Sequence, residues 1–224
     1  MARIVVLQHN EHAHAGRLAR ALRDHGFRLD TRRVDLPPGQ GGKPVPDDLD
    51  NVHALIVLGG AQNVDEGHDF LSGEQALIRR AHEAELPIVG ICLGAQQVAM
   101  ALGGQVARMP VPEVGLGPVS LTPTGQTETI LAGIPWSARL PSHAYEISKT
   151  PPGAVLLGSS PACKVQAFRV GMRTYGFQHH FECDIPMARD LMERSMHLAD
   201  DAGVTREQLD AQFEQHAEMF DRSA

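Results

Sequence analysis

A five-residue segment with a glycine at each end, Gly90-Ile91-Cys92-Leu93-Gly94, constrains the fold more than any other part of the chain. Aliphatic residues typical of a buried strand precede it. Small and aliphatic residues at helical spacing follow it, namely Ala95, Val98, Ala99 and Leu102. A turn that joins a strand to a helix around a nucleophilic residue is the geometry of a nucleophile elbow. The segment therefore predicts an α/β fold in which Cys92 lies on a strained turn at the end of a strand.

The rest of the first half supports a parallel sheet with crossover helices, because short aliphatic runs alternate with helical patterns. The predicted strands are 3–8, 27–34, 54–58 and 88–91, and the predicted helices are 16–25 and 72–85, the second opened by a capping box at Ser72-x-x-Gln75. A Pro- and Gly-rich surface loop is expected over 36–48. Further short strands are predicted at 119–122, 154–158, 165–169 and 174–181. This half should be richer in strands and partly antiparallel.

The length of 224 residues suits one large domain and leaves no room for a second catalytic domain of ordinary size. The end of the chain returns to a helical pattern. Pro186 suits a first helical position, Gly203 a break, and Thr205-x-x-Gln208 another capping box. We therefore expect a domain over 1–184 and a helical extension over 185–224 that packs on the same domain.

Composition excludes several classes of protein. With 20 basic and 27 acidic residues the net charge is −7, so neither nucleic acid nor an anionic membrane surface is an expected partner. No run of about 18 apolar residues could span a membrane, and the first apolar run is too short for a signal peptide. The three cysteines form no Cys-x-x-Cys pair and are too few for a disulfide framework. We expect a cytoplasmic protein that needs no cofactor.

The position of Cys92 suits a nucleophile. At the N-terminus of a helix the backbone dipole favours a thiolate. The backbone N–H of Leu93 would face the negative charge that develops when the sulfur attacks a carbonyl group. Gly59-Gly60, at the end of a neighbouring predicted strand, is the natural source of a second such donor. The alternative is that Cys92 is a small buried hydrophobic residue and the glycines form a simple turn.

A cysteine nucleophile needs a base, and the base needs an orienting acid. Residues 175–182 are predicted to form a strand, in which alternate side chains share a face. His180 would then lie beside Glu182, whereas His179 would point the other way as a packed or surface histidine. This pattern favours His180 as the general base and Glu182 as its orienting acid, although the sequence leaves an exchange of the two histidines open.

Three ordered motifs together resemble the class I glutamine amidotransferases: Gly59-Gly60, Gly-Ile-Cys-Leu-Gly-Ala-Gln at 90–96, and Gly-Phe-Gln-His-His-Phe-Glu at 176–182. The likeness extends from the first strand to about Asp184. It is strongest to stand-alone proteins similar to the glutaminase domain of guanosine monophosphate synthase.

The resemblance implies a flavodoxin-like fold with an open, mostly parallel sheet, and hydrolysis of the glutamine side-chain amide through a γ-glutamyl thioester. It makes Cys92, His180 and Glu182 the catalytic triad and gives the oxyanion hole to the backbone N–H groups of Gly60 and Leu93. The resemblance also implies that Gln96 helps to hold the substrate, and that His143 or Tyr145, in Ser142-His143-Ala144-Tyr145-Glu146, lies beside it. For the two last residues, a loop with a structural histidine is an equal alternative.

Two departures from the family pattern lie beside the expected pocket. The family commonly has Phe-His-Pro-Glu where this chain has His179-His180-Phe181-Glu182, and a proline after Gly-Gly where this chain has Ala61-Gln62-Asn63. Both changes retain the catalytic residue types, so they bear on the identity of the substrate more than on the chemistry.

Other residues that could bind a metal or react have simpler interpretations. His9, His12 and His14, with Glu11, fit no preferred ligand spacing and are expected in a polar loop after the first strand. Cys183 is expected to be packed, and Cys163 has no evident role. Gly115-Leu116-Gly117-Pro118 lacks the pattern of a phosphate loop. No metal site is therefore predicted.

Three functional hypotheses remain. The first is a glutaminase subunit that supplies ammonia to a separate synthetase subunit. The second is a stand-alone hydrolase of γ-glutamyl amides or peptides. The third is a non-catalytic relative that binds a ligand or senses thiol oxidation, against which the intact Cys92, His180 and Glu182 count.

Overall fold

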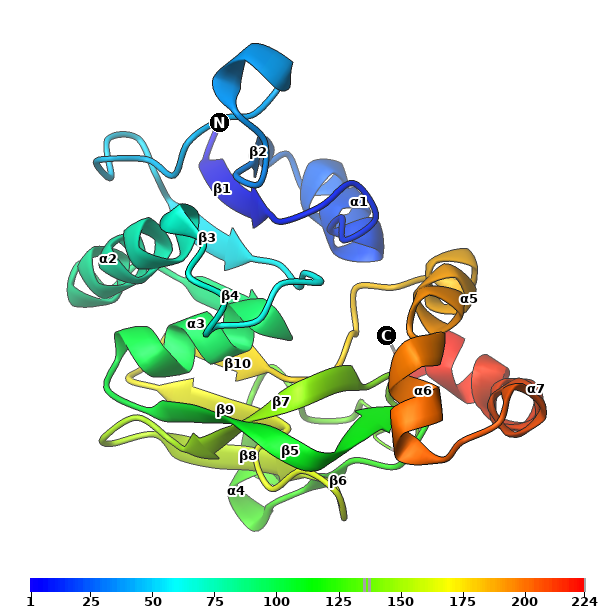
Figure 1. Cartoon of the computed structure of the whole chain (residues 1–224). Helices are drawn as coiled ribbons and strands as arrows, with labels where there is room; N and C mark the ends of the chain where they lie inside the picture. The colour runs from blue at the N-terminus through cyan, green and yellow to red at the C-terminus, as the bar shows by residue number, and fades with distance from the viewer. Residues whose placement is uncertain (135, 137, 224) are drawn as a thin grey trace.

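The structure, a computed structural model, describes residues 1–134, 136 and 138–223. Within these residues, eight strands form one sheet in the order β2-β1-β3-β4-β10-β9-β8-β6, and two more form a separate ribbon (Figure 1). The strands of the sheet are β1 (Arg3–Gln8), β2 (Arg28–Arg33), β3 (Ala54–Val57), β4 (Ile88–Ile91), β6 (Ser120–Leu121), β8 (Val155–Ser159), β9 (Ala167–Val170) and β10 (Thr174–Phe177). The ribbon consists of β5 (Gln105–Val114) and β7 (Ser142–Lys149).

The helices connect these strands and cover the sheet. Within the described residues they are α1 (Gly16–Asp24), α2 (Asp69–Glu83), α3 (Leu93–Ala101), α4 (Pro123–Thr127), α5 (Ile185–Arg194), α6 (Met196–Ala202) and α7 (Arg206–Ser223), with a 3-10 turn, η1 (Pro38–Gln40). The predicted surface loop at 36–48 contains that turn. Of the helices within the described ranges, none has the length and apolar character to cross a bilayer.

The sheet is parallel from β2 to β10 and antiparallel from β10 to β6. This confirms the predicted mostly parallel sheet with antiparallel strands in the second half. The strand order reverses at β1, which has β2 on one side and β3 on the other. In open α/β sheets, ligands bind beyond the carboxyl ends of the strands at such a point.

Alternating side chains of the parallel strands separate the two faces of the sheet. Residues such as Val5 and Val57 pack with the helices α2 and α3 in one core cluster. Their neighbours, such as Ile4 and Ile56, pack with α1 and Cys92 in another. Because both faces are covered, the central strands β1, β3 and β4 carry continuous aliphatic runs, as expected for a buried parallel sheet.

Two boundaries differ from the prediction by three residues or more, and several others differ by one or two. The helix α2 begins at Asp69, and Ser72 lies inside its first turn, where the hydroxyl donates to the Asp69 carbonyl, so the predicted capping box is wrong. The strand β10 ends at Phe177 rather than at 181. The ribbon of β5 and β7 was not predicted, because Pro110 and Pro112 interrupt β5 and its pairing is irregular between Arg108 and Glu113.

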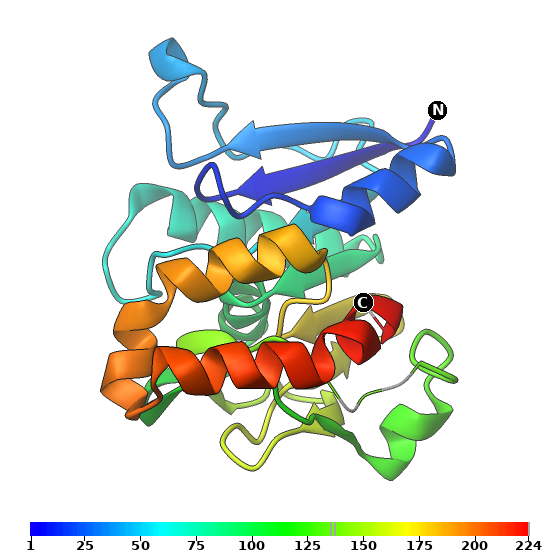
Figure 2. The same ribbon diagram turned by 90° about the vertical axis from the view of Figure 1, so that its right-hand side faces the viewer.

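The C-terminal helices α5, α6 and α7 form a layer across one side of the molecule (Figure 2). The Asp184 side chain caps α5 by accepting from the Met187 N–H at 3.0 Å. The predicted capping box before α7 is confirmed. The backbone N–H of Thr205 donates to the Gln208 side-chain oxygen, and the backbone N–H of Gln208 donates to the Thr205 hydroxyl oxygen. The layer buries a core cluster that includes Phe213 and Phe220 and extends to Leu116 and Leu140.

Candidate active site

The turn that carries Cys92 has the backbone geometry of a nucleophile elbow. Cys92 follows β4 directly, has φ 52° and ψ −110°, and is followed at once by α3. Its backbone is fixed on both sides, because its N–H donates to the Phe177 carbonyl at 2.8 Å and its carbonyl accepts from the Gln96 N–H at 3.1 Å. A non-glycine residue in this region of backbone space is strained, and such strain is common at functional sites.

Glycines make the elbow possible. A Cβ atom on Gly94 would lie 1.9 Å from the Val57 carbonyl oxygen, and one on Gly90 would lie 2.5 Å from the Gly94 carbonyl oxygen. Both contacts are with backbone, which cannot move aside as a side chain can. The first turn of α3 therefore packs directly against the end of β3 only because residue 94 has no side chain.

A cavity of about 690 Å³ opens beside Cys92 at the carboxyl ends of the parallel strands. All the residues that the sequence analysis assigned to the site line it: Gly60, Cys92, Leu93, Gln96, His143, Tyr145, His180 and Glu182. The fold thus brings together segments that lie far apart in the sequence.

His180 and Glu182 form a buried pair in this cavity. The distance from His180 Nδ1 to Glu182 Oε1 is 2.7 Å. The two residues do not lie on a strand as predicted, because β10 ends earlier. A hydrogen bond from the His180 N–H to the Leu140 carbonyl, at 2.9 Å, holds the segment instead. Burial would lower the pKa of His180, but the charge and hydrogen bonds of Glu182 and Cys92 raise it well above its ordinary value.

His179 belongs to the hydrophobic core. Its ring lies edge-on to Trp136, with centroids 5.3 Å apart, and also contacts Phe177 at 5.9 Å. Burial, followed by the positive charge of Arg139, lowers the pKa of His179 well below its ordinary value. A neutral, packed histidine is one of the two interpretations that the sequence allowed, and it leaves His180 as the histidine beside the cysteine.

Two backbone N–H groups next to Cys92 have no hydrogen-bond acceptor among the described residues, those of Gly60 and Leu93. A Cβ atom on Gly60 would lie 3.0 Å from Leu93 Cδ2, so the two residues are in close contact. A Cβ atom on Gly59 would lie 2.9 Å from His180 Cε1 and 3.4 Å from the Cys92 Cβ. The Gly59-Gly60 segment can therefore approach the cysteine and the histidine only without side chains.

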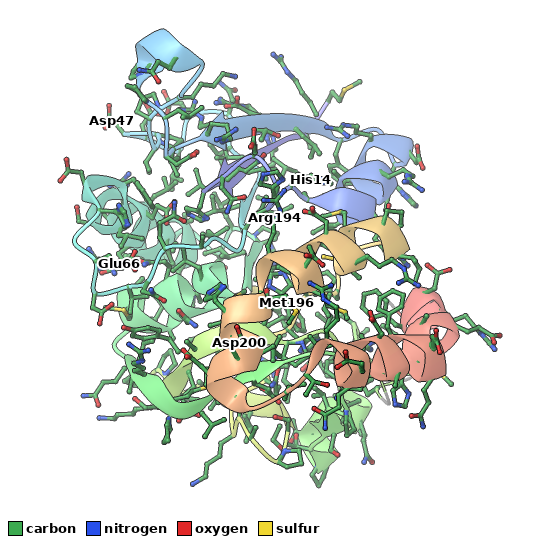
Figure 3. All side chains as sticks on the ribbon, turned by 45° about the vertical axis from the view of Figure 1, so that its right-hand side comes forward. His14, Asp47, Glu66, Arg194, Met196 and Asp200 are labelled. Atoms are coloured by element: carbon green, nitrogen blue, oxygen red, sulfur yellow. The ribbon has the colours of Figure 1, made fainter. Side chains whose placement is uncertain are left out.

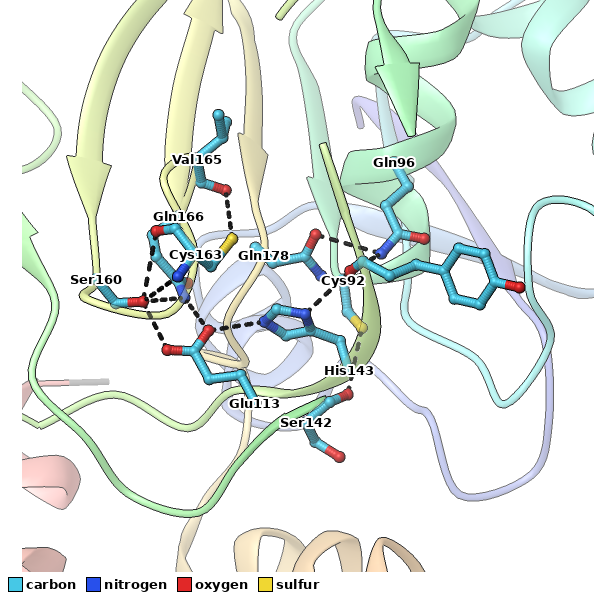
Figure 4. A network of polar contacts seen from close by, with 11 residues as sticks. Cys92, Gln96, Glu113, Ser142, His143, Ser160, Cys163, Val165, Gln166 and Gln178 are labelled. Carbon is cyan, nitrogen blue, oxygen red and sulfur yellow. Dashed lines mark hydrogen bonds and ion pairs between the residues drawn. The ribbon is translucent and has the colours of Figure 1, made fainter. Parts of the chain in front are cut away.

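Gln96 and Tyr145 both line the cavity. Figure 4 shows Gln96 and Gln178 joined by a hydrogen bond. Gln96 Nε2 donates to the Tyr145 carbonyl at 3.0 Å and to Gln178 Oε1 at 3.2 Å. Among the described residues, no hydrogen bond engages the amide oxygen of Gln96. The Tyr145 hydroxyl donates to Asp65 at 2.8 Å.

His143 has no free ring nitrogen, although it lines the cavity. Its Nδ1 is 3.0 Å from the Tyr145 carbonyl oxygen and its Nε2 is 3.0 Å from Glu113 Oε2, as Figure 4 shows. Both partners are acceptors, so both ring nitrogens are already used. His143 therefore holds the backbone of Tyr145 in place at the edge of the cavity.

A polar cluster beside His143 was missed by the sequence analysis. Glu113 accepts from Ser160 and from Gln166, each at 2.6 Å, and the ligand atoms of Glu113, His143 and Cys163 lie within 4.8 Å of one another. The Cys163 thiol donates to the Val165 carbonyl, and burial raises its pKa to about 12. Glu113 is therefore satisfied by Ser160, Gln166 and His143, whereas the Gln166 amide oxygen is buried without a partner among the described residues.

The segment after β1 is a loop, as predicted, but part of it is buried. His9 is completely buried and pairs with the buried Glu74 at 2.8 Å. His12 lies at the surface and lines the cavity together with Asn10, whose side chain accepts from the N–H groups of His12 and Ala13. No signal in the sequence marked Glu74, which lies on α2 among residues of an ordinary amphipathic helix.

The helices α5 and α6 form the outer wall of the cavity. Asp190, Leu191, Arg194, His197, Leu198 and Asp201 line it. Figure 3 looks onto these helices, whose course from α5 into α6 is marked by Arg194, Met196 and Asp200. Arg194 donates to Asp190 at 2.8 Å, and both side chains are about half exposed. The C-terminal helices thus contribute directly to the cavity above Cys92.

The chain belongs to the class I glutamine amidotransferases. The family model for glutamine amidotransferase class-I matches residues 7–194. This match confirms the resemblance drawn from the three motifs. The matched range includes Cys92, His180 and Glu182, all of which line the cavity.

Particular relatives agree with this assignment. The chain is 30% identical over 214 residues to the glutamine amidotransferase-like protein YfeJ of Salmonella typhimurium, covering 90% of this chain and 84% of that protein. One subunit of the glutamine-hydrolysing GMP synthase of Thermoplasma acidophilum is 35% identical over 159 residues, covering 68% of this chain and 76% of that relative.

Solved structures show the same fold. A glutamine amidotransferase of Methylobacillus flagellatus superposes with a TM-score of 0.81 at 23% identity, over 100% of this chain and 92% of that one. A glutamine amidotransferase of Thermotoga maritima superposes with a TM-score of 0.78 at 22% identity, over 98% of this chain and 93% of that one. Both similarities cover the C-terminal helices, so the helical layer is part of a fold that other proteins share.

Proposed function

We propose that the protein is a cysteine-dependent amidase that hydrolyses a γ-glutamyl amide, with glutamine as its simplest substrate. The observation that carries the proposal is the arrangement around the cavity. A cysteine lies on a strained elbow, and a buried His180–Glu182 pair interacts with it. The adjoining residues Gly60 and Leu93 have backbone N–H groups without an acceptor among the described residues. Each part matches a requirement of acyl transfer through a covalent intermediate.

In the proposed reaction, the Cys92 sulfur attacks the side-chain carbonyl carbon of the substrate. The carbonyl oxygen becomes an oxyanion that accepts from the N–H groups of Gly60 and Leu93. His180, holding a proton on each ring nitrogen, protonates the leaving nitrogen, and ammonia or an amine departs as the thioester forms. The neutral His180 then takes a proton from water, which attacks the thioester and releases glutamate and the sulfur.

Two versions of this function remain, and they differ in the fate of the nitrogen. A docking glutaminase would pass ammonia to a separate synthetase, as the similarity to one GMP synthase subunit favours. A stand-alone hydrolase would release an amine or a peptide. The cavity supports the second version, because about 690 Å³ lies in the ~300–1,000 Å³ range of pockets for ligands larger than an amino acid.

A substrate panel tests the proposal and separates the two versions. The purified protein is incubated with glutamine and with a series of γ-glutamyl amides and peptides, and the rates of release are compared. A stand-alone hydrolase turns over at least one larger γ-glutamyl compound faster than glutamine. A docking glutaminase hydrolyses glutamine slowly and the larger compounds no faster. Absence of hydrolysis with every compound would contradict both and leave the non-catalytic alternative.

The role of Glu182 is tested by Glu182→Gln. The amide retains the shape and one acceptor oxygen but not the charge, so kcat is expected to fall by about 10²–10⁴-fold with the fold intact. Because Glu182 raises the pKa of His180, the imidazolium form is retained to higher pH than in a free histidine and is lost as the pH rises through that pKa. The variant should therefore lose activity at a lower pH on the basic side.

The matched control is Glu214→Gln, the same change on the exposed side of α7. It should leave both kcat and the pH profile unchanged. A Glu182→Gln enzyme with undiminished kcat would refute the orienting role of the carboxylate.

A further inference from the structure

His9 lies directly behind the Gly59-Gly60 segment. Its Nδ1 is 3.0 Å from the Gly59 carbonyl oxygen, and a Cβ atom on Gly60 would lie 2.8 Å from the His9 Cβ. The His9 carbonyl also accepts from Gln62 Nε2 at 2.9 Å, which ties the loop after β3 to the end of β1. No part of the His9 ring reaches solvent, so its contacts are fixed by the fold.

The hydrogen bond to Gly59 determines where the Gly60 N–H points. The Gly59 carbonyl and the Gly60 N–H belong to one peptide group, and in a trans peptide they point in opposite directions. The peptide bonds of the described residues are all trans. When the His9 ring holds the carbonyl on its own side, the N–H is directed away from that ring, and Gly60 itself lines the cavity.

Glu74 fixes the protonation of the ring. His9 Nε2 is 2.8 Å from Glu74 Oε1, and both residues are fully buried. A carbonyl and a carboxylate are both acceptors, so each ring nitrogen needs a proton to satisfy its partner. Burial would lower the pKa of His9, but the charge and hydrogen bond of Glu74, together with the Gly59 carbonyl, raise it above its ordinary value. A charged donor also polarises the Gly59–Gly60 peptide and strengthens its N–H as a donor.

We propose that His9 is a positioning residue of the oxyanion hole: its Nδ1–H holds the Gly59 carbonyl, and this hydrogen bond keeps the Gly60 N–H directed at the reacting carbonyl group above Cys92. Glu74 acts through His9 by keeping the ring oriented and doubly protonated. The inference rests on the proposed function, because the role of the Gly60 N–H is part of that proposal.

Two substitutions of His9 separate this role from a purely structural one. Asparagine places an amide nitrogen near the position of Nδ1 and can donate to Gly59, whereas glutamine places it near the position of Nε2 and reaches only Glu74. We expect His9→Gln to lower kcat by about 10²–10³-fold, the effect of losing one oxyanion donor. His9→Asn should keep kcat within about tenfold, since a neutral donor replaces a charged one. KM should change little in either variant.

The alkylation rate of Cys92 by iodoacetamide supplies a second readout. This reaction displaces iodide at a saturated carbon and needs no oxyanion hole, so its rate should be alike in the wild type and both variants. The control His25→Gln, at an exposed histidine directly after α1, should change neither kcat nor the alkylation rate. Equal kcat values for His9→Gln and wild type, or a His9→Gln enzyme more active than His9→Asn, would overturn the proposal.

A measurement on the unmodified protein covers the case in which the His9 variants do not fold. In the ¹⁵N NMR spectrum of histidine-labelled protein, both ring nitrogens of His9 should be protonated. The His9 signal is identified as the one that shifts in the variant Glu74→Gln, because Glu74 contacts its Nε2. An unprotonated Nδ1 would overturn the proposal, because nothing would then donate to the Gly59 carbonyl. If the wild-type protein hydrolyses no γ-glutamyl compound, the proposed function fails first, and the His9 protonation state is still measured independently.

Discussion

Cys92→Ser is expected to lower kcat for γ-glutamyl amide hydrolysis by at least about 10⁴-fold, because removing the nucleophile of a triad costs nearly all of the catalysis. A serine hydroxyl at the same place is far less nucleophilic than a thiolate, and His180 is predisposed to keep its proton. The replacement differs by one atom and lies at the start of α3, so the fold should be retained. Turnover and thermal unfolding are measured on the same preparation.

Cys163→Ser is the matched control for this change. Cys163 is buried, lies outside the lining of the cavity, and donates to a carbonyl oxygen as a serine hydroxyl also can. Its turnover should stay within about twofold of the wild type, as for substitutions away from the reacting groups. A Cys92→Ser enzyme as active as Cys163→Ser would contradict the assignment of Cys92.

Gly94→Ala is expected to destabilise the folded protein by about 3 kcal/mol or more, at the upper end of the effects of overpacking. The new Cβ would lie 1.9 Å from the Val57 carbonyl oxygen and 2.5 Å from the Val57 carbonyl carbon. Val57 lies in β3, in the middle of the parallel strands, so its backbone cannot retreat. If the protein still folds, α3 must shift, and the Leu93 N–H moves with it, so turnover should fall as well.

Gly73→Ala provides the comparison in urea unfolding experiments. Gly73 lies within α2, and a Cβ there would make only ordinary contacts with Val45, at 3.7 Å or more. Alanine favours a helix over glycine by about 0.8–1 kcal/mol, so this variant should be more stable than the wild type. Equal free energies of unfolding for Gly94→Ala and wild type would show that the packing at the elbow is not as tight as the structure requires.

The local sequence was sufficient where a strand and its neighbours are buried on both faces. The bounds of β1 and β4 agree with the prediction. A continuous aliphatic run of this length is too short for a helix and typical of a buried strand. The elbow was predictable for a different reason: two glycines around a cysteine, between a strand and a helix, leave few other conformations.

The parts that sequence reasoning missed depend on contacts between distant residues. His180 and Glu182 lie side by side as expected, but they do not lie on a strand. A hydrogen bond from the His180 N–H to the Leu140 carbonyl holds this segment instead of pairing within the sheet. His9 was assigned to a polar loop because its partner Glu74 lies 65 residues away, and nothing in either neighbourhood marks the other. The ribbon of β5 and β7 was missed because prolines hide its periodicity.

Covalent labelling with a glutamine-like alkylating analogue tests the central claim most directly. The protein carries three cysteines, and Cys183 lines the cavity as Cys92 does. Burial, as the largest cause, raises the pKa of the Cys183 thiol well above its ordinary value, so this thiol should react slowly. After digestion, mass spectrometry should find the label on Cys92 alone, at one equivalent per chain and in step with the loss of activity. Labelling of Cys183 or Cys163 in place of Cys92, or full loss of activity with Cys92 unmodified, would contradict the account.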